Sequence, residues 1–129
     1  MAKILSKIED KLCQAMYRFV EEHFYGIKES IKELGFDSKK DMLSKIKSNP
    51  QDAAWALMEL CTWGMNKDYT SSDLLCDTFN RDGSIVEVFK IKHKGRCYYC
   101  TIEWDCEKKE YVIHRVKQKT VNVLKWVNI

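Results

Sequence analysis

The hydrophobic residues in the N-terminal half of the chain recur at steps of three and four, the spacing that lines up one face of an α-helix. The first such run extends from about Lys3 to Leu34, and Gly35 behind it can adopt the left-handed conformation that ends helices. Ser38 and Asp41 then have the spacing of a helix start, which predicts a short second helix. The front of the chain is therefore expected to be helical.

A third helix is predicted to begin at Asn49 and Pro50, because Asn caps helices well and Pro fits the first helical position. We expect this helix to end at Gly64. The capping spacing recurs just before residues 71–79 and predicts one more short helix there. Residues 80–83 (Asn, Arg, Asp, Gly) have the composition of a tight turn.

From Ile85 onward the hydrophobic period changes to two, which is the period of a β-strand. Strands are predicted over residues 85–92, 97–104, 111–116 and 120–127, with a hairpin turn at residues 93–96. On the second strand, Tyr98, Cys100, Ile102 and Trp104 share the expected core face. The pattern predicts an α+β fold of three or four N-terminal helices followed by a four-stranded antiparallel β-meander.

Composition limits the size and class of the fold. A chain of 129 residues with 45% hydrophobic residues can form one core, so we expect one domain over residues 1–129, with a helical part (1–80) and a β-meander (85–129). It has no apolar stretch of membrane-spanning length and no signal-peptide pattern. These features predict a cytoplasmic protein that does not enter a membrane.

Six cysteines make thiol or metal chemistry a candidate activity of the chain. We expect reduced thiols that serve as small core residues. Cys97 and Cys100 have the C-x-x-C spacing of a zinc knuckle, with Cys106 as a third ligand, but alternate residues of a strand face opposite ways. Packing is therefore predicted in place of metal binding, and a thiol or zinc-dependent enzyme is kept as an alternative.

Motifs of catalysis are missing from the chain. Gly-rich phosphate loops, H-E-x-x-H and nucleophile elbows do not occur, and no carboxylate pair suits acid–base chemistry. The acids of the first helix are interleaved with lysines, as in ion-paired, solvated helix faces. We therefore expect a protein that is not an enzyme and uses no cofactor.

Positive charge gathers in the C-terminal part. Residues 85–129 hold ten Lys/Arg against five Asp/Glu, a balance of +5, whereas residues 1–66 hold ten of each. Lysines beside aromatic residues on a sheet suit single-stranded nucleic acid, although lysines on edge strands also prevent edge-to-edge pairing. The residues predicted to contact a partner are Lys90, Lys92, Arg96, Tyr99, Lys117, Lys125 and Trp126.

The last predicted strand is apolar on both faces, since Val121, Val123 and Val127 alternate with Leu124 and Trp126. Either other parts of the fold cover both faces, or one face contacts another protein or a second copy of the chain. The sequence leaves both interpretations open.

Several C-terminal segments resemble the last strands of small phage and prophage proteins. They are residues 88–91 (VFKI), 98–99 (YY), 103–105 (EWD) and 116–123 (VKQKTVNV) with Trp126. The resemblance implies a mobile-element protein in a bacterial cell that binds a host or phage protein. Our leading prediction is a non-enzymatic inhibitor of a host defence factor such as a CRISPR effector, an anti-CRISPR type of protein. The alternative is a single-stranded nucleic-acid-binding module that uses the basic, aromatic β face.

Overall fold

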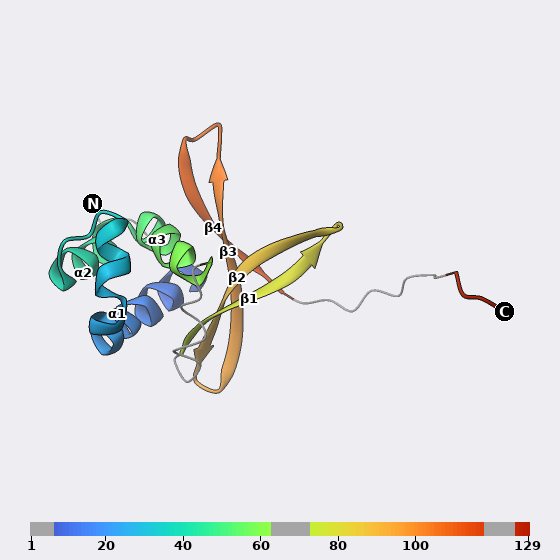
Figure 1. Ribbon diagram of the computed structural model, residues 1–129, viewed down its shortest axis with the longest axis horizontal. Helices are drawn as coiled ribbons and strands as arrows, with labels where there is room; N and C mark the ends of the chain where they lie inside the picture. Colours follow the sequence, from blue (N-terminus) through green and yellow to red (C-terminus); the bar gives the residue numbers. More distant parts are fainter. Residues whose placement is uncertain (1–6, 63–72, 118–125) are drawn as a thin grey trace.

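The computed structural model describes residues 7–62, 73–117 and 126–129. Within these ranges, three helices are followed by an antiparallel sheet of four strands (Figure 1). The predicted α+β class and the order of helices before strands are confirmed.

The three helices are α1 (Lys7–Glu33), α2 (Lys39–Ser48) and α3 (Pro50–Thr62). The structure confirms the predicted end of α1: Gly35 has a φ of +98°, and the Phe36 N–H donates to the Ile31 carbonyl at 3.0 Å. This pairing is the usual way for a left-handed residue to close a helix end.

The starts of α2 and α3 are also confirmed. The Ser38 hydroxyl accepts a hydrogen bond from the Asp41 N–H at 3.1 Å, and the Asn49 side-chain oxygen accepts one from the Asp52 N–H at 3.2 Å. Each cap satisfies a backbone donor that the helix itself leaves without a partner. Local sequence therefore determines these boundaries.

The strands are β1 (Leu74–Arg81), β2 (Ser84–His93), β3 (Arg96–Asp105) and β4 (Glu110–Val116), and they are neighbours in chain order. Asp82 and Gly83 between β1 and β2 both have positive φ, as do Lys94 and Gly95 between β2 and β3. Two consecutive positive φ values are typical of the type I′ turn, which matches the twist of a hairpin.

The helix predicted over residues 71–79 is wrong, and β1 occupies most of that segment. Leu74 pairs with Ile91 of β2, and the pairing continues to Arg81 opposite Ser84. A capping signal is local, whereas the hairpin turn that follows places the whole segment beside β2, where ladder bonds and burial favour a strand. The helical part therefore stops before residue 80.

The fourth predicted strand falls mainly on residues that the structure does not describe. Positions 118–125 lie outside the described ranges, and residues 126–129 have no regular secondary structure. Trp126 and Val127 are exposed there.

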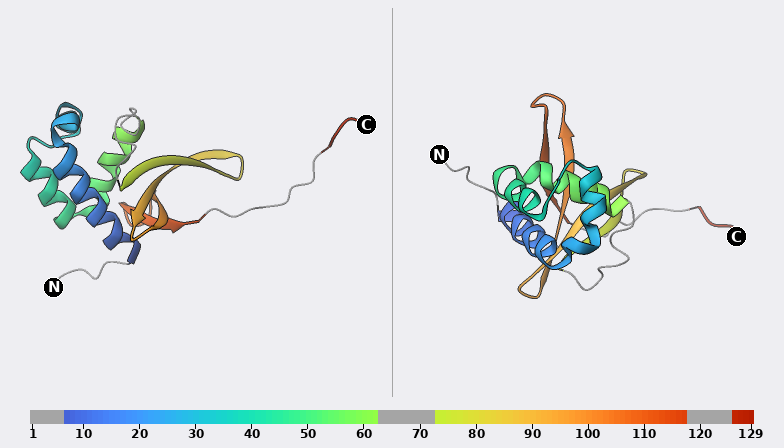
Figure 2. Two further views of the ribbon diagram at one scale, coloured as in Figure 1. Left: turned by 90° about the horizontal axis from the view of Figure 1, so that it is seen from below. Right: turned by 60° about the vertical axis from the view of Figure 1, so that its left-hand side comes forward.

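The helices lie together on one side of the sheet (Figure 2). α1 and α3 make the main contacts with the strands, while α2 packs on the other two helices. One hydrophobic cluster joins Leu12 and Ile31 of α1 to Leu57 of α3 and to Phe89 and Cys100 of the sheet. Burying this shared apolar surface is the main force that holds the two layers together.

The predicted core face of β3 is confirmed along most of its length. Cys100 is fully buried, and Tyr98 and Ile102 pack against the core. Trp104, at the far end of the strand, is 52% exposed. The opposite face, here called the outer face, therefore carries Lys90, Tyr99 and their alternating neighbours.

None of the helices in the described ranges has the length and apolar character needed to cross a membrane.

Candidate functional site

The outer face of the sheet brings several of the predicted partner-binding residues together. Lys90 lies opposite Tyr99 in the β2–β3 pairing, and Tyr99 lies opposite Val116 in the β3–β4 pairing. Lys92 follows two residues after Lys90 on the same face, and Lys117 follows Val116 directly. We call Lys90, Lys92 and Tyr99 the basic row. The half-buried Tyr99 ring lies directly opposite Lys90, and Lys92 is the next residue along the same face. Lys117 does not belong to the row, because it follows the last residue of β4 and strand alternation gives it the face opposite to that of Val116 and Tyr99.

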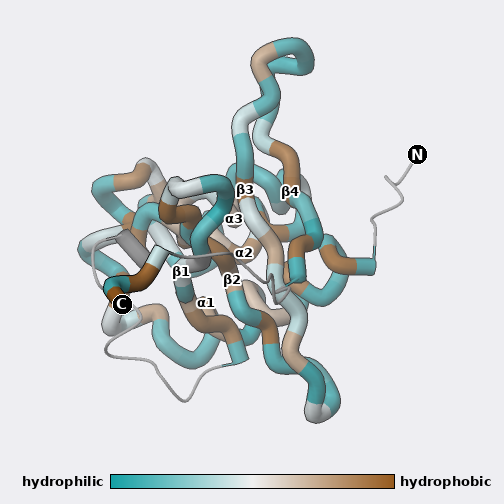
Figure 3. Tube along the Cα trace, turned by 90° about the vertical axis from the view of Figure 1, so that its right-hand side faces the viewer, coloured by the Kyte–Doolittle hydropathy of each residue, from teal (hydrophilic) through white to brown (hydrophobic). Residues whose placement is uncertain are grey.

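The remaining predicted contact residues do not join this row. Arg96 opens β3 and, by alternation, shares the inner face with Tyr98. Trp126 is fully exposed outside the sheet, and Lys125 lies outside the described residues. Seen from the side away from the helices, the turn at the β2–β3 end is hydrophilic (Figure 3).

On the inner side of the same end, cations surround Tyr98. A pocket of about 300 Å³ lies between the start of α1 and strands β3 and β4, and we call it the Tyr98 pocket. The Lys11 Nζ lies 4.8 Å from the centre of the Tyr98 ring, and the Arg115 guanidinium carbon lies 5.5 Å from it. Both distances fall within the range of cation–π attraction. The residues that line the pocket are Lys7, Ile8, Lys11, Arg96, Tyr98 and Arg115.

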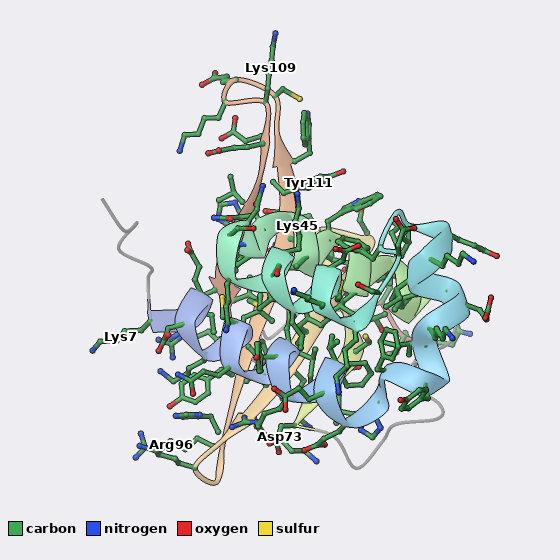
Figure 4. All side chains as sticks on the ribbon, turned by 90° about the vertical axis from the view of Figure 1, so that its left-hand side faces the viewer. Lys7, Lys45, Asp73, Arg96, Lys109 and Tyr111 are labelled. Atoms are coloured by element: carbon green, nitrogen blue, oxygen red, sulfur yellow. The ribbon has the colours of Figure 1, made fainter. Side chains whose placement is uncertain are left out.

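Lys7 and Arg96 line the pocket from different elements, and both side chains extend outward on the same side of the molecule (Figure 4). Some cations elsewhere in the described chain have acidic partners: Arg18 pairs with Asp73 at 3.3 Å, and Lys45 pairs with Asp52 at 3.7 Å. No carboxylate is among the residues that line the Tyr98 pocket. The pocket therefore has an excess of positive charge that the described residues do not neutralise.

Sequence reasoning identified Arg96 and the neighbouring tyrosines but missed Lys7, Lys11 and Arg115. Lys7 and Lys11 are four residues apart, so they share one helical face, and this spacing was their only local signal. Arg115 gave no signal, because its role depends on how β4 pairs with β3 beneath α1.

The weak zinc candidate is not supported by the geometry. Cys97 is exposed and Cys100 is buried, because they face opposite sides of β3. Cys106 lies in the turn at the other end of the strand, about 30 Å from Cys97 along a chain that rises about 3.3 Å per residue. Among the described residues, no group of three potential ligands could hold a metal.

The expectation of reduced cysteines is wrong for Cys76. It is disulfide-bonded, which hydrophobic periodicity does not reveal. Cys13, Cys97, Cys100 and Cys106 are free. Burial raises the pKa of Cys100 to about 12, and burial together with the charges of Asp10 and Glu9 raises the pKa of Cys13 to about 11. Both thiols stay protonated near neutral pH and are poor nucleophiles.

A second surface is aromatic. The Trp55 and Tyr111 rings stack with centroids 5.5 Å apart, and Trp104 meets Tyr111 edge-on at 4.9 Å. Trp55 and Tyr111 line a groove of about 500 Å³, here called the aromatic groove, and two of its lining residues, Lys45 and Tyr111, are labelled in Figure 4. The lining residues are Leu34, Gly35, Phe36, Asp41, Lys45, Asp52, Trp55 and Tyr111.

The outer face also carries a charged cluster away from the basic row. Glu103 pairs with Arg81 of β1, and its other oxygen lies 3.5 Å from the His114 Nε2. The buried Thr101 hydroxyl oxygen beside them has no hydrogen-bond partner among the described residues. Because Arg81 and His114 flank Glu103, this acid does not offset the lysines of the basic row.

Comparison of the chain with protein-family models, with curated proteins and with solved structures finds no match in any of the three. The function is therefore argued from the described geometry.

Proposed function

We propose that this protein is a non-enzymatic binding module for single-stranded nucleic acid, which it holds at the end of the sheet formed by the β2–β3 hairpin. The observation that supports this proposal is the basic row, in which Lys90 lies opposite the half-buried Tyr99 and the exposed Lys92 follows on the same sheet face. Lysines neutralise backbone phosphates, and an aromatic ring beside them offers a stacking platform for a base.

The distribution of acids favours this end of the molecule. Asp73 lies near the hairpin, but its carboxylate pairs with Arg18. Glu103 on the outer face lies between Arg81 and His114. Asp77, opposite Val88, is a further acid on this face, but Lys90 and Lys92 outnumber it, so the surface attracts a polyanion.

Two lysines set the expected salt dependence. If each neutralises one phosphate, the logarithm of the association constant should fall with the logarithm of salt concentration at a slope of about −1.4, since single strands give about −0.7 per phosphate. The variant Lys90→Glu/Lys92→Glu should bind at least tenfold more weakly and with a slope shallower by about 1.4. Fluorescence anisotropy with a labelled oligonucleotide at several salt concentrations measures both quantities.

Two exposed lysines of α1 provide the matched control. Lys28→Glu/Lys32→Glu changes the net charge by the same amount but lies outside the basic row. If both double variants weaken binding equally, the attraction is a general charge effect and the proposed surface is wrong.

The stacking role of Tyr99 has its own test. Tyr99→Ala should cost about 1–3 kcal/mol of binding free energy, whereas Tyr99→Phe should retain most of it, because the phenyl ring still stacks. Equal losses for the two variants would assign the effect to the hydroxyl group and refute stacking.

A second candidate function is the phage-type inhibitor of a host defence protein, and the aromatic groove favours it. Trp104 is 52% exposed beside the Trp55–Tyr111 stack, and tryptophan and tyrosine are the residues that most often anchor protein interfaces. For this candidate function the partner is a protein such as a CRISPR effector, and a surface of that partner would fill the aromatic groove.

This candidate is tested with a purified CRISPR effector, by measuring its cleavage of target DNA with increasing amounts of the protein. Trp104→Ala should raise the concentration that gives half inhibition by at least tenfold, the typical cost of losing an interface anchor. Tyr25→Ala removes another exposed aromatic residue outside the groove and should have no effect. If wild type does not inhibit the effector, that partner is wrong.

A further inference from the structure

The inner side of the same hairpin end carries a second site, and we propose that the Tyr98 pocket binds a phosphomonoester, the phosphate group at the end of a nucleic-acid strand. This inference rests on the proposed binding of single strands. It names the part of the strand that the pocket recognises and adds three cations, Lys7, Lys11 and Arg115, that belong to no predicted contact set.

Charge is the first reason. Four cations from three elements line the pocket, and no acidic residue is among the described residues that line it. A phosphodiester inside a strand carries one negative charge, whereas a terminal phosphomonoester carries about 1.5 to 2 at neutral pH and offers three acceptor oxygens. Arg96 and Arg115 add planar guanidinium groups, whose paired N–H donors match phosphate oxygens. The pocket therefore fits the more highly charged group.

The surroundings of the Tyr98 ring indicate that the pocket recognises a charged group and not a base. Lys11 and Arg115 both lie over this ring, at 4.8 and 5.5 Å from its centre. His93 lies edge-on to it, with centroids 6.5 Å apart. A ring with two cations over it holds those cations in place by its electron density and is not free to stack on a base. Tyr98 is thus a positioning residue for Lys11 and Arg115.

The position of the Tyr98 pocket between α1 and the sheet favours the end of a nucleic-acid strand over its middle. The pocket has α1 on one side, through Lys7, Ile8 and Lys11, and the sheet on the other, through β3 and β4. A continuing backbone needs an open path on both sides of each phosphate, and the basic row on the outer face provides such a surface. A pocket backed by a helix accepts a terminal group.

The experiment compares oligonucleotides of one sequence that carry a 5′-phosphate, a 3′-phosphate or hydroxyls at both ends, by fluorescence anisotropy with an internal label. One phosphate-ended strand should bind about tenfold more tightly than the hydroxyl-ended strand, the equivalent of one charge-assisted hydrogen bond. Lys7→Gln/Arg115→Gln should remove this preference. Lys28→Gln/Lys32→Gln, with the same change in net charge, should keep it. Circular dichroism checks that both double variants are folded.

Small molecules test whether the Tyr98 pocket recognises a phosphate group by itself or only at the end of a nucleic-acid strand. Adenosine monophosphate should bind and adenosine should not, as measured by calorimetry, and Lys7→Gln/Arg115→Gln should abolish that binding. If strands fail to bind while adenosine monophosphate binds in this way, the phosphomonoester site stands and the proposed strand-binding function is overturned.

Three results would overturn the inference. Equal binding of phosphate-ended and hydroxyl-ended strands would refute end recognition and leave the proposed function intact. Competition by poly-glutamate as strong as that of the phosphate-ended strand would show a site for acidic peptides. Absence of binding to every phosphate probe would refute both the pocket and the strand-binding function.

Discussion

Burial of the Cys100 thiol makes the stability of the fold depend on pH above about 9, and removal of the thiol should remove that part of the dependence. Cys100 is fully buried, and burial raises its pKa from 9.0 to about 12. Desolvation is the cause, since a thiolate loses its water shell in the core. The folded state therefore keeps its proton in a pH range where the unfolded chain releases it.

The direction and size of the effect follow from proton linkage. A folded-state pKa above the unfolded value gives stability that is fully present below pH 9 and is lost progressively as pH rises from 9 toward 12. At pH 10 an unfolded thiol with a pKa of 9.0 is about tenfold more ionised than protonated. The free energy of unfolding that the thiol contributes at low pH and that is lost by pH 10 is RT ln 11, or about 1.4 kcal/mol.

The assay is urea denaturation of wild type and Cys100→Ala at pH 7, 8, 9 and 10. The free energy of unfolding of wild type should fall by about 1.4 kcal/mol more than that of the variant between pH 8 and 10, whatever constant cost the smaller side chain adds. Cys106→Ala, at an exposed position, controls for the loss of a thiol as such. Parallel pH profiles for wild type and Cys100→Ala would show that the thiol is not desolvated and refute the reasoning.

Three further stability predictions follow from local geometry, each measured by chemical denaturation. Phe89→Ala should lower the free energy of unfolding by about 3–5 kcal/mol, because Phe89 is fully buried in the cluster that joins the layers; a loss under about 1 kcal/mol would contradict its place there. Ser38→Ala should cost about 1 kcal/mol through loss of the α2 cap, whereas Ser38→Asp should cost little, and equal losses would exclude capping. Gly83→Ala should cost about 1–2 kcal/mol, since φ there is +87°, with Ser84→Ala as the neutral comparison.

Sequence patterns predicted the features that depend on a few neighbouring residues. Gly35, Ser38 and Asn49 determine helix ends because their caps close within a single turn of backbone. Asp82-Gly83 and Lys94-Gly95 determine hairpins because the turns require positive φ. The alternation along β3 identified its core face, since burial selects one side of a strand.

The one wrong element, the helix over residues 71–79, shows where local signals fail. A capping spacing can occur before a strand, and the short apolar run at Leu74 and Leu75 fits either period. The pairing of Leu74 with Ile91 decides the outcome, and this partner lies across a hairpin.

The candidate sites also combine features that the sequence predicted with features that only the packing of the layers decided. Sequence alone determined the α+β class, the basic character of the C-terminal part and the placement of Lys90 and Tyr99 on strands. Only the tertiary structure decided that Lys7 and Arg115 line the same pocket, because α1 must first pack across β3 and β4. Periodicity indicates which face of an element is buried, but the cations that meet around Tyr98 come from elements far apart in the chain. Their proximity arises from packing between layers, for which no local pattern exists.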